Sequence, residues 1–328
     1  MTRDLSRESI LKTSREFTEA RILLTGAELG LFSLLSEESL TADDVVSRLK
    51  TDLRATTILL DVLSAQGYLV KEKGRYHTEP EVAPYLSADS DKSLLPGLMH
   101  SAHLWTTWTQ LTKVVREGGP AKSRKPGREE YMKAFIGAMH IVSARIAPEV
   151  VKAVRPGTAR VLLDVGGGSG SYTIAFLQAV SGMRATIFDL QDVIPLAQER
   201  IAGEGFLDRV DLVSGDYHKD ELPSGHDLAF LSAVIHQNSH EQNVELYRKV
   251  YKSLGSGGRI VIRDYVMSSD GTEPASGALF AVNMLVNTHG GDSYTIDEIR
   301  EGLMEAGFVR VKLLQEKEMS SLVEAFKK

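Results

Sequence analysis

Short apolar runs alternate with amphipathic segments through the second half of the chain. They are rich in Val, Leu, Ile and Phe and lie at residues 159–165, 185–189, 209–213, 227–235 and 259–264. Continuous apolar runs of this length are typical of strands buried on both faces of a parallel sheet. Helical spacing separates most of them, which predicts a doubly wound arrangement. With residues 308–314 and 321–326 as an antiparallel edge, the expected fold class is α/β with a mostly parallel seven-stranded sheet.

The first 92 residues have a different, mainly helical pattern. Thr41 is a suitable N-cap for a helix over residues 42–49, and a further helix is expected over residues 52–66. Residues 68–78 read as a small hairpin, so helices followed by a hairpin predict a winged-helix-like domain. The last of these helices is apolar and carries only Arg54 as a cation, whereas a DNA-recognition helix needs several polar side chains. A dimerisation module is therefore favoured over DNA binding.

A helical bridge is expected between this domain and the sheet. Residues 93–156 show helical spacing of Leu, Met and aromatic side chains, interrupted by a basic, exposed loop over residues 121–130. Pro156 and Gly157 suggest the hinge into the next domain. The expected domains are therefore residues 1–92, 93–156 and 157–328.

The first apolar run ends in a glycine-rich turn. Gly166, Gly167 and Gly168 follow Asp164, and helical spacing resumes at Tyr172. A strand, a glycine turn and a helix N-terminus form a cradle for a nucleotide-like ligand. The dinucleotide fingerprint is not met, because Ser171 occupies the position of its third glycine. This spacing opposes a nicotinamide-dependent dehydrogenase.

Further polar residues follow the next apolar runs. Asp189 and Leu190 end the second run, about 20 residues after the glycine turn, where a ribose-binding acid belongs. Asp216 and Tyr217 follow the third run, and His236 follows the fourth. Ligands of such sheets bind outside the carboxyl ends of the strands, so we expect these side chains to share one edge with Asp164.

The order Asp-Val-Gly-Gly-Gly-Ser-Gly, Phe-Asp-Leu and Gly-Asp-Tyr resembles the S-adenosylmethionine-dependent small-molecule O-methyltransferases. The similar branch includes plant caffeate and flavonoid enzymes and bacterial polyketide and phenazine enzymes. The resemblance implies a Rossmann-like methyltransferase domain and transfer of a methyl group to a hydroxyl of an aromatic or polyketide-like small molecule. It also implies a homodimer, formed through the N-terminal domain, that closes the partner's pocket.

The resemblance assigns cofactor contacts to the residues at the strand ends. Gly166, Gly167 and Gly168 would let the backbone approach the methionine part of S-adenosylmethionine. Asp164 either accepts from the cofactor's amino group or braces the turn. The ribose and adenine contacts would come from four residues, Asp189, Leu190, Asp216 and Tyr217. Ser232 lies where relatives often carry Lys or Arg near the cofactor.

The resemblance also proposes His236 as the general base. The motif His-Asp-Trp-Ser-Asp-Glu of the family reads His-Gln-Asn-Ser-His-Glu from His236 here, with Gln237 in place of the first Asp. Relatives place an orienting Glu in a later loop, at the position of Ser293. Neither Gln237 nor Ser293 carries a negative charge that could fix the imidazole tautomer. Asp292 is adjacent to Ser293 and is expected to face elsewhere.

The acceptor pocket is expected between the bridge and the late loop. The residues that match family positions lining it are Phe135, Met139, Met284, Thr288 and His289. His289 is the alternative base.

Composition excludes several classes of protein. The formal net charge is −6, which opposes bulk electrostatic binding of nucleic acid. The chain has no cysteine, and His236 with His240 form too small a set for a metal site, so no metal is expected. No apolar run is expected to be long enough to span a bilayer, and residues 1–8 are too polar for a signal peptide. The expected location is the cytoplasm, without membrane or nucleic-acid partners.

Alternatives remain open at this stage. The altered surroundings of His236 fit transfer to carbon or nitrogen, or a relative that uses the cofactor non-catalytically in hydroxylation or decarboxylation. A cofactor-sensing, winged-helix DNA-binding regulator is the alternative of another class.

Overall fold

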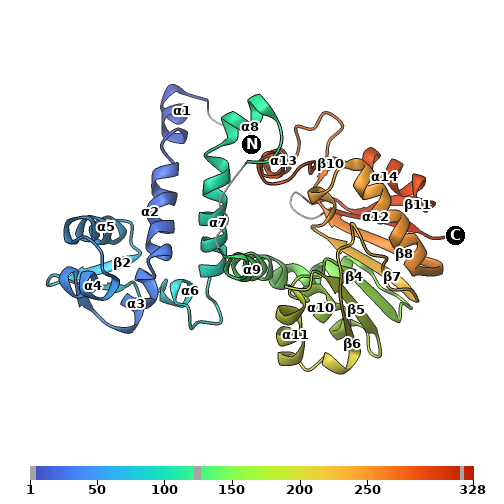
Figure 1. Ribbon diagram of the computed structural model, residues 1–328, viewed down its shortest axis with the longest axis horizontal. Coiled ribbons are helices and arrows are strands. Elements are labelled where there is room, and N and C mark those ends of the chain that lie inside the picture. The colour runs from blue at the N-terminus through green and yellow to red at the C-terminus, as the bar shows by residue number, and fades with distance from the viewer. Residues whose placement is uncertain (1–4, 122–126, 318–320) are drawn as a thin grey trace. The chain divides into compact units, whose positions relative to one another are not determined.

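The computed structural model describes residues 5–121, 127–317 and 321–328. The chain divides into two compact units, of which the first ends at Trp105 and the second begins at Thr106. Figure 1 shows helices dominating the first unit and a sheet flanked by helices in the second.

The first unit combines short helices with a three-stranded antiparallel sheet of order β1-β3-β2. Its elements are α1 (Arg7–Thr13), α2 (Phe17–Glu28), α3 (Leu31–Glu37), β1 (Leu40–Thr41), α4 (Ala42–Leu49), α5 (Leu53–Ala65), β2 (Leu69–Glu72), β3 (Arg75–Thr78) and α6 (Ala83–Leu86). The predicted cap is confirmed, because the Thr41 side chain accepts from the backbone N–H of Asp44. The predicted hairpin is β2 and β3, whereas β1 is an addition that the pattern did not predict.

A compact apolar core holds the first unit together. Leu31, Phe32, Leu60 and Leu63 are fully buried and pack in one cluster. Thr78 donates from Oγ1 to the carbonyl of Phe32 at 2.8 Å, which joins β3 to α3. The core-facing residues of α5 are therefore apolar because they fill the interior of this unit.

Three helices lead into the sheet. They are α7 (Leu95–Trp108), which crosses the boundary between the units, α8 (Leu111–Glu117) and α9 (Arg128–Val154). The loop predicted over residues 121–130 is wrong at its end, because α9 begins at Arg128 with acidic side chains in its first turn. Residues 122–126 of that loop lie outside the described residues.

Helix α9 is, within the described residues, the one helix long and apolar enough to cross a membrane by length and composition alone. Core helices pass the same test. In α9, Val150, Val151 and Val154 are buried in the cluster formed with α10 and the sheet. This packing accounts for the apolar residues at its C-terminal end.

The second unit is built on a seven-stranded sheet of order β11-β12-β8-β7-β4-β5-β6 among the described residues. Its strands are β4 (Val161–Val165), β5 (Arg184–Asp189), β6 (Val210–Ser214), β7 (His226–Ser232), β8 (Leu254–Asp264), β11 (Val309–Gln315) and β12 (Ser321–Phe326). β4 to β8 pair in parallel, and β12 pairs antiparallel with both β8 and β11. The predicted fold class is confirmed.

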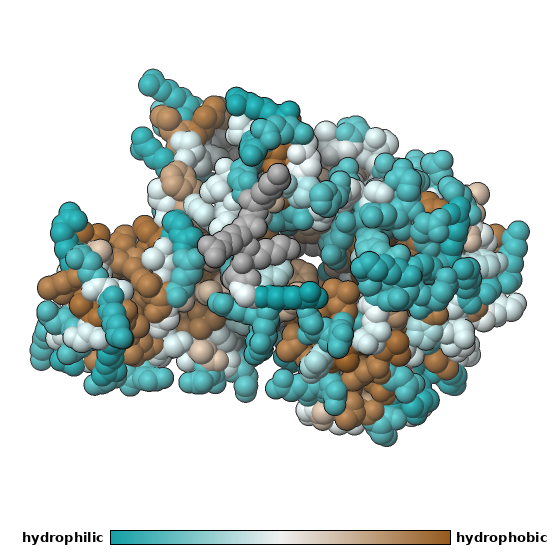
Figure 2. Space-filling view, viewed as in Figure 1, coloured by the Kyte–Doolittle hydropathy of each residue, from teal (hydrophilic) through white to brown (hydrophobic). Residues whose placement is uncertain are grey.

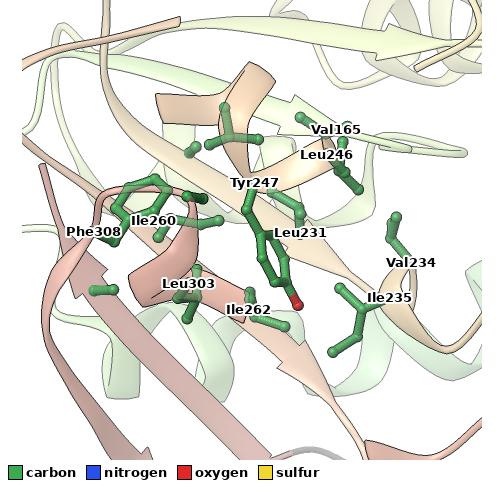
Figure 3. Close-up of a cluster of buried hydrophobic side chains, with 14 of the residues drawn as sticks. Val165, Leu231, Val234, Ile235, Leu246, Tyr247, Ile260, Ile262, Leu303 and Phe308 are labelled. Carbon is green, nitrogen blue, oxygen red and sulfur yellow. The ribbon is translucent and has the colours of Figure 1, made fainter. Parts of the chain in front are cut away.

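Helices cover both faces of this sheet (Figure 1). They include α10 (Ser171–Ala179), α11 (Ile194–Gly203), α12 (His240–Ser253) and α14 (Ile296–Glu305), whereas α13 (Ala275–Asn287) contacts α8 and β9. On one face Tyr247 of α12, Leu303 of α14 and Ile262 of β8 belong to one buried cluster (Figure 3). On the other face Phe176 of α10 and Ile201 of α11 pack with Phe230 of β7.

The bounds of two strands differ from those expected. The apolar run over residues 227–235 was expected to be one strand, but β7 ends at Ser232 and Ala233 has a φ of +58°. Val234 and Ile235 are buried by packing in the core and not by sheet pairing, so their apolar character does not mark a strand. The glycine segment Gly255–Gly258 follows the end of α12 as expected, but it also belongs to β8, which begins at Leu254 and not at the predicted residue 259.

A short two-stranded parallel ladder is formed after β8. β9 (Val266–Met267) follows β8 almost directly and pairs with β10 (Tyr294–Thr295). This pairing holds the loop of residues 288–293, which leads into β10, next to the carboxyl ends of β7 and β8. In that loop, a Cβ on Gly291 would clash with the backbone of His236 and Gln237.

Candidate functional site

The glycine turn after β4 has backbone conformations that side chains rarely adopt. Gly166, Gly168 and Gly170 have φ angles of +67°, +56° and +76°. A Cβ on Gly166 would meet Val234 at 2.9 Å, whereas a Cβ on Gly168 would meet only Ile136, at 3.9 Å. The turn is therefore closed toward the core at Gly166 and open at Gly168, where a ligand can approach the backbone.

Asp164 lies beneath this turn. Its carboxylate is buried and accepts from Thr173 Oγ1 at 2.7 Å, and a Cβ on Gly167 would press against it at 3.0 Å. Burial raises the pKa of Asp164 to about 7. Of the two roles predicted for Asp164, this geometry supports bracing of the turn, since the side chain joins β4 to α10.

Asp189 links the end of β5 to the turn. Its Oδ2 accepts from the backbone N–H of Gly168 at 2.8 Å, and its Oδ1 accepts from that of Leu190 at 2.7 Å. A carboxylate has about four acceptor positions, so capacity remains for two hydroxyl donors. Burial raises the pKa of Asp189, while the Gly168 and Leu190 N–H groups oppose that shift.

Asp216 and Tyr217 lie after β6, in a tight turn. Asp216 accepts from Lys219 Nζ at 2.8 Å and from the backbone of His218 at 3.0 Å, and the bond to Lys219 lowers its pKa. The Tyr217 hydroxyl donates to Asn238 Oδ1 at 3.3 Å, and burial raises the pKa of this phenol to about 12. Tyr217 therefore ties the loop after β6 to the segment that carries His236.

Ser232 ends β7 and is half-buried. Its Oγ accepts from Nη1 of Arg263 at 3.2 Å, and the two residues are register partners on β7 and β8. A cation thus lies beside Ser232. It comes from the neighbouring strand.

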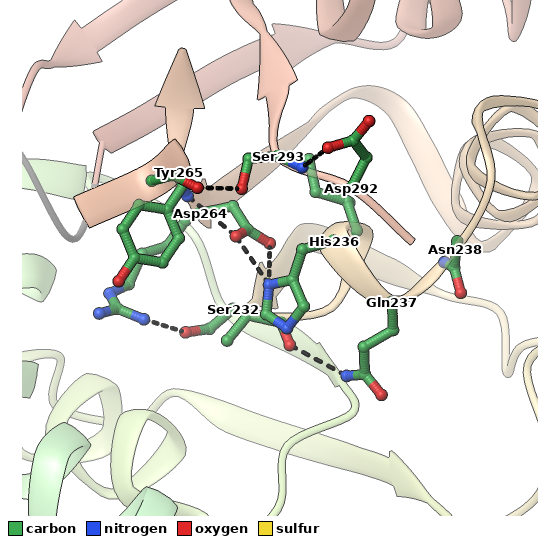
Figure 4. A network of polar contacts seen from close by, with 12 residues as sticks. Ser232, His236, Gln237, Asn238, Asp264, Tyr265, Asp292 and Ser293 are labelled. Atoms are coloured by element: carbon green, nitrogen blue, oxygen red, sulfur yellow. Dashed lines mark hydrogen bonds and ion pairs between the residues drawn. The ribbon is translucent and has the colours of Figure 1, made fainter. Parts of the chain in front are cut away.

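The pair formed by His236 and Asp264 is the central polar contact of the site. His236 Nδ1 lies 2.8 Å from Oδ1 and 3.0 Å from Oδ2 of Asp264, and the two residues are 8% and 4% exposed (Figure 4). An ionised carboxylate can only accept, so Nδ1 donates and Nε2 keeps its lone pair. Phe280 of α13 packs against the imidazole with ring centroids 4.7 Å apart.

Asp264 is the residue that reasoning from the sequence missed. Gln237 and Ser293 were expected not to supply a negative charge to His236, and the carboxylate comes instead from the end of β8, 28 residues further along the chain. The backbone N–H of Tyr265 donates to Asp264 Oδ1 at 2.9 Å and fixes it. Its position in the sequence could have indicated this role, because Asp264 ends a buried strand in the same way as Asp189.

Gln237, Ser293 and Asp292 make other contacts. Gln237 is exposed and donates to the carbonyl of Ala233. Ser293 donates to the carbonyl of Gly277, and Asp292 accepts from the backbone of Ser293, turned away from the imidazole in Figure 4. The expectation that Asp292 faces elsewhere is confirmed.

The predicted acceptor residues lie on two helices of the second unit and on the loop that follows one of them. Phe135 and Met139 are half-buried on α9, where Phe135 stacks on Tyr131. Met284 is buried on α13, and Thr288 closes that helix by donating to the carbonyl of Met284 and accepting from Gly291. His289 is exposed, unlike His236.

Helix α9 also contributes a histidine to the glycine turn. His140 Nδ1 lies 2.8 Å from Ser171 Oγ, and Ser171 Oγ lies 2.9 Å from Ser169 Oγ. Burial lowers the pKa of His140 to about 4, and the charge of Arg200 adds to this effect. The imidazole is therefore neutral at physiological pH and acts as a hydrogen-bonding group that joins α9 to α10.

No cluster of three or more His, Cys, Asp or Glu side chains suited to a metal ion exists in the parts of the chain that the structure describes. His236 uses Nδ1 for Asp264, and Ser239 separates it from His240 as the N-cap of α12.

Two domain families match the chain. The O-methyltransferase domain matches residues 108–309, and the O-methyltransferase dimerisation domain matches residues 11–87. The first match alone covers more than half of the chain.

Similar proteins agree with these matches. The 3-hydroxy-5-methyl-1-naphthoate 3-O-methyltransferase of Streptomyces sahachiroi is 30% identical over 312 residues, which cover 90% of this chain and 88% of the relative. The L-tyrosine C(3)-methyltransferase of Streptomyces lavendulae is 29% identical, over 87% of this chain and 82% of the relative. The solved structure of PigF with SAH is 25% identical, with a TM-score of 0.86 over 98% of this chain and all of that chain.

Proposed function

The chain belongs to the O-methyltransferase family, whose members use S-adenosylmethionine, and on that premise we propose the reaction and the residues that perform it. The site transfers a methyl group to a hydroxyl of an aromatic or polyketide-like small molecule. The observation that carries this proposal is the buried pair of His236 and Asp264, which presents an imidazole lone pair beside the predicted cofactor site.

The residues along the strand ends fit the cofactor. When bound, S-adenosylmethionine supplies an electrophilic methyl group on a positively charged sulfur. Gly168 leaves its backbone open to the methionine part, while Gly166 and Gly167 permit the turn. Asp189 accepts from the ribose hydroxyls, beside the backbone of Leu190. Asp216 and Tyr217 hold the adenine, and Ser232 lies at the opposite end of the site.

His236 acts as the general base. A phenol has a pKa near 10, so removing its proton as the methyl group arrives lowers the barrier at neutral pH. Asp264 keeps the proton of the neutral imidazole on Nδ1, leaves Nε2 to accept from the acceptor hydroxyl, and stabilises the imidazolium that results. The rest of the catalysis is close, in-line positioning of the two reactants.

The acceptor pocket takes its walls from α9 and α13. Phe135 and Met139 supply apolar and aromatic surface, and Met284 and Thr288 lie on the other side. Phe280, which packs against His236, extends this surface to the base. Such a lining suits a flat aromatic acceptor. His289 is too exposed to serve as the base.

The N-terminal part serves dimerisation. The match to the dimerisation domain of this family supports a homodimer, and helices α4 and α5 followed by the hairpin of β2 and β3 fit a winged-helix-like domain over residues 1–92. Residues 93–156 then form the helical bridge, and residues 157–328 form the catalytic domain. The apolar α5 opposes a role in DNA recognition.

Transfer to carbon is the second candidate, because a relative of similar identity is named for methylation of L-tyrosine at C(3). The Asp264 carboxylate favours oxygen, since it completes the base that a hydroxyl requires. Mass spectrometry of the product distinguishes a methyl group on oxygen from one on carbon.

The test is turnover of hydroxylated aromatic acceptors by wild-type protein and by the variant His236→Ala. Loss of a general base lowers turnover by about 100-fold or more. The control variant is His289→Ala, which should keep wild-type turnover. Near-wild-type turnover in His236→Ala would remove His236 from the mechanism, and a loss confined to His289→Ala would assign the base to the late loop.

A further inference from the structure

A second charged side chain, Arg263, is buried at the end of β8. It is 7% exposed and directly precedes Asp264. Its guanidinium donates to Ser232 Oγ at 3.2 Å, and its central carbon lies 5.5 Å from the centre of the Tyr172 ring. Its position at the edge of the sheet where ligands bind therefore suggests a function.

The alternation of β8 gives Arg263 and Asp264 opposite faces of the sheet. Val261 packs in the cluster that contains Tyr172 and Phe230, whereas Ile262 packs in the cluster on the other face. Arg263 therefore points toward α10 and the glycine turn. Asp264 points toward α13 and His236, so the two charges serve different neighbours.

The order of the strands defines a line across the site. Asp216 follows β6, Asp189 ends β5, and the glycine turn follows β4. In the order β8-β7-β4-β5-β6, the next strands beyond the turn are β7 and β8, which end in Ser232 and in Arg263 with Asp264. With adenine assigned to β6 and ribose to β5, the amino-acid end of the cofactor comes to the turn and to these two strands.

The surroundings of Arg263 hold its positive charge in place. Tyr172 is the second residue of α10, immediately after the turn, and its ring faces the guanidinium. Burial raises the pKa of the Tyr172 hydroxyl, and the charge of Arg263 acts in the opposite direction. A guanidinium has a planar fork of donors that matches a carboxylate in two parallel hydrogen bonds.

We propose that Arg263, positioned by Ser232 and Tyr172, binds the carboxylate of the amino-acid part of S-adenosylmethionine. The chain thus supplies from β8 the cation that Ser232 cannot supply from β7. This assignment rests on the cofactor site proposed above and adds a binding residue to it.

The test compares two ligands by calorimetry. S-adenosylhomocysteine carries the carboxylate, whereas methylthioadenosine has the same nucleoside end without the amino acid. In Arg263→Met the dissociation constant of S-adenosylhomocysteine should rise ~10- to 100-fold, the scale of a charge-assisted hydrogen-bonded pair. That of methylthioadenosine should stay within about threefold, because the residues that hold the nucleoside are intact.

Two further variants keep the test decisive. Arg263→Lys keeps the charge but loses the fork, so it should give a smaller loss and also covers the case in which Arg263→Met fails to fold. Adding Ser232→Lys to Arg263→Met returns a cation from the register partner and should restore part of the affinity for S-adenosylhomocysteine.

Equal weakening of both ligands would assign Arg263 a packing role and overturn the proposal. Unchanged binding of S-adenosylhomocysteine, with a raised KM for the acceptor, would place Arg263 in the acceptor pocket instead. Failure of the wild-type protein to bind either ligand would refute the cofactor site itself, which separates that failure from an error about Arg263 alone.

Discussion

At the scale of single residues, the proposed function depends on which nitrogen of His236 carries the proton. Asp264 decides this, because its two oxygens both lie within hydrogen-bonding distance of Nδ1. Since both residues are nearly excluded from solvent, water competes little for this bond. Phe280 packs against the imidazole and further fixes the orientation of the ring, and with it the direction of the lone pair on Nε2.

Replacing this carboxylate tests its role directly. Asp264→Asn can offer an N–H to Nδ1 and so favour the tautomer with its proton on Nε2, which cannot accept from the acceptor. We expect turnover near pH 7 to fall by about 100-fold or more. The defect should shrink as the pH approaches about 10, where a phenolic acceptor ionises without help. Turnover is measured across this range at saturating cofactor.

Asp292→Asn is the matched control for this variant, because Asp292 is exposed in the adjacent loop and accepts only from Ser293 in the contacts described above. It should leave turnover unchanged at every pH. A defect in Asp264→Asn that stays constant up to high pH would show that the variant has lost positioning and not base function.

Asp164 provides a residue-scale prediction about stability. Burial raises its folded-state pKa from 3.8 to about 7, the bond from Thr173 opposes this, and the charge of Asp189 adds to it. The folded protein therefore keeps a proton that the unfolded chain loses between about pH 4 and pH 7. The stability this contributes is complete below about pH 4 and is lost as the pH rises through about 7.

The measurement is urea unfolding of wild-type protein and Asp164→Asn from about pH 5 to pH 8. Relative to the variant, the free energy of unfolding of the wild type should fall with rising pH, by up to about 1.4 kcal/mol per unit, and level off above pH 7. Asp216→Asn is the control, because the pKa of Asp216 is lowered and its titration lies below this range. Parallel curves for wild type and Asp164→Asn would contradict the assigned ionisation.

Sequence reasoning found the residues that adjoin a pattern and missed those that depend on pairing between strands. Asp189 could be predicted because it ends an apolar run at a known spacing from the glycine turn. Asp264 contacts His236, and Arg263 contacts Ser232. Both contacts depend on the register between β7 and β8, which α12 separates in the sequence. No local spacing reports that register, although the strand-end position of Asp264 was a usable signal.

At the scale of elements, the glycine turn joins β4 to α10 in a form that only glycine adopts easily. Gly168 combines a φ of +56° with open space beyond its Cα, and its N–H is held by Asp189. The positive φ angle of Gly168 is a property of the backbone alone. The open space beyond its Cα matters only for a ligand that approaches the backbone.

A pair of substitutions separates these two properties. Gly168→Ala and Gly182→Ala both place a Cβ at a positive φ, +56° and +76°, and should each cost about 1–2 kcal/mol of stability. Gly182 has nothing within 4 Å of the added Cβ and precedes β5, at the strand end opposite to Asp189. Calorimetry should show that only Gly168→Ala weakens S-adenosylhomocysteine, by at least about 10-fold. Equal affinities in both variants would exclude close approach of the ligand to Gly168.

The elements themselves were largely predictable, because long apolar runs and helical spacing report burial directly. The errors lie where burial comes from another source. Val234 and Ile235 extend the apolar run of β7 but are buried after the chain has left the sheet at Ala233. Gly255–Gly258 read as a helix stop, which is correct for α12, yet the same residues begin β8. A hydrophobic pattern reports that a residue is buried, but it does not report whether a neighbouring strand or another part of the core buries it.

At the scale of the whole molecule, the surface of the first unit bears on assembly. In the first unit apolar side chains lie exposed on α1 and α5, and Figure 2 shows them interrupting the polar surface there. Leu5, Ile10 and Leu11 on or beside α1 are 74%, 58% and 48% exposed. No residue of α1 is buried within its own unit. A helix with this composition gains stability by covering these side chains in an assembly.

Charged residues on this surface of α1 should disrupt the proposed homodimer. Replacing Ile10 and Leu11 together by Asp places two charges on α1, where a homodimer would bury them without partners. Sedimentation should show the mass of the wild type to be twice that of this variant. The control is Met304→Asp, since Met304 is equally exposed, at 59%, but lies on α14 of the catalytic unit. It should remain dimeric.

Both variants should bind S-adenosylhomocysteine as the wild type does, because every proposed cofactor residue lies in the second unit. A dimeric double variant would place the interface away from α1, and a monomeric wild type would refute the homodimer itself.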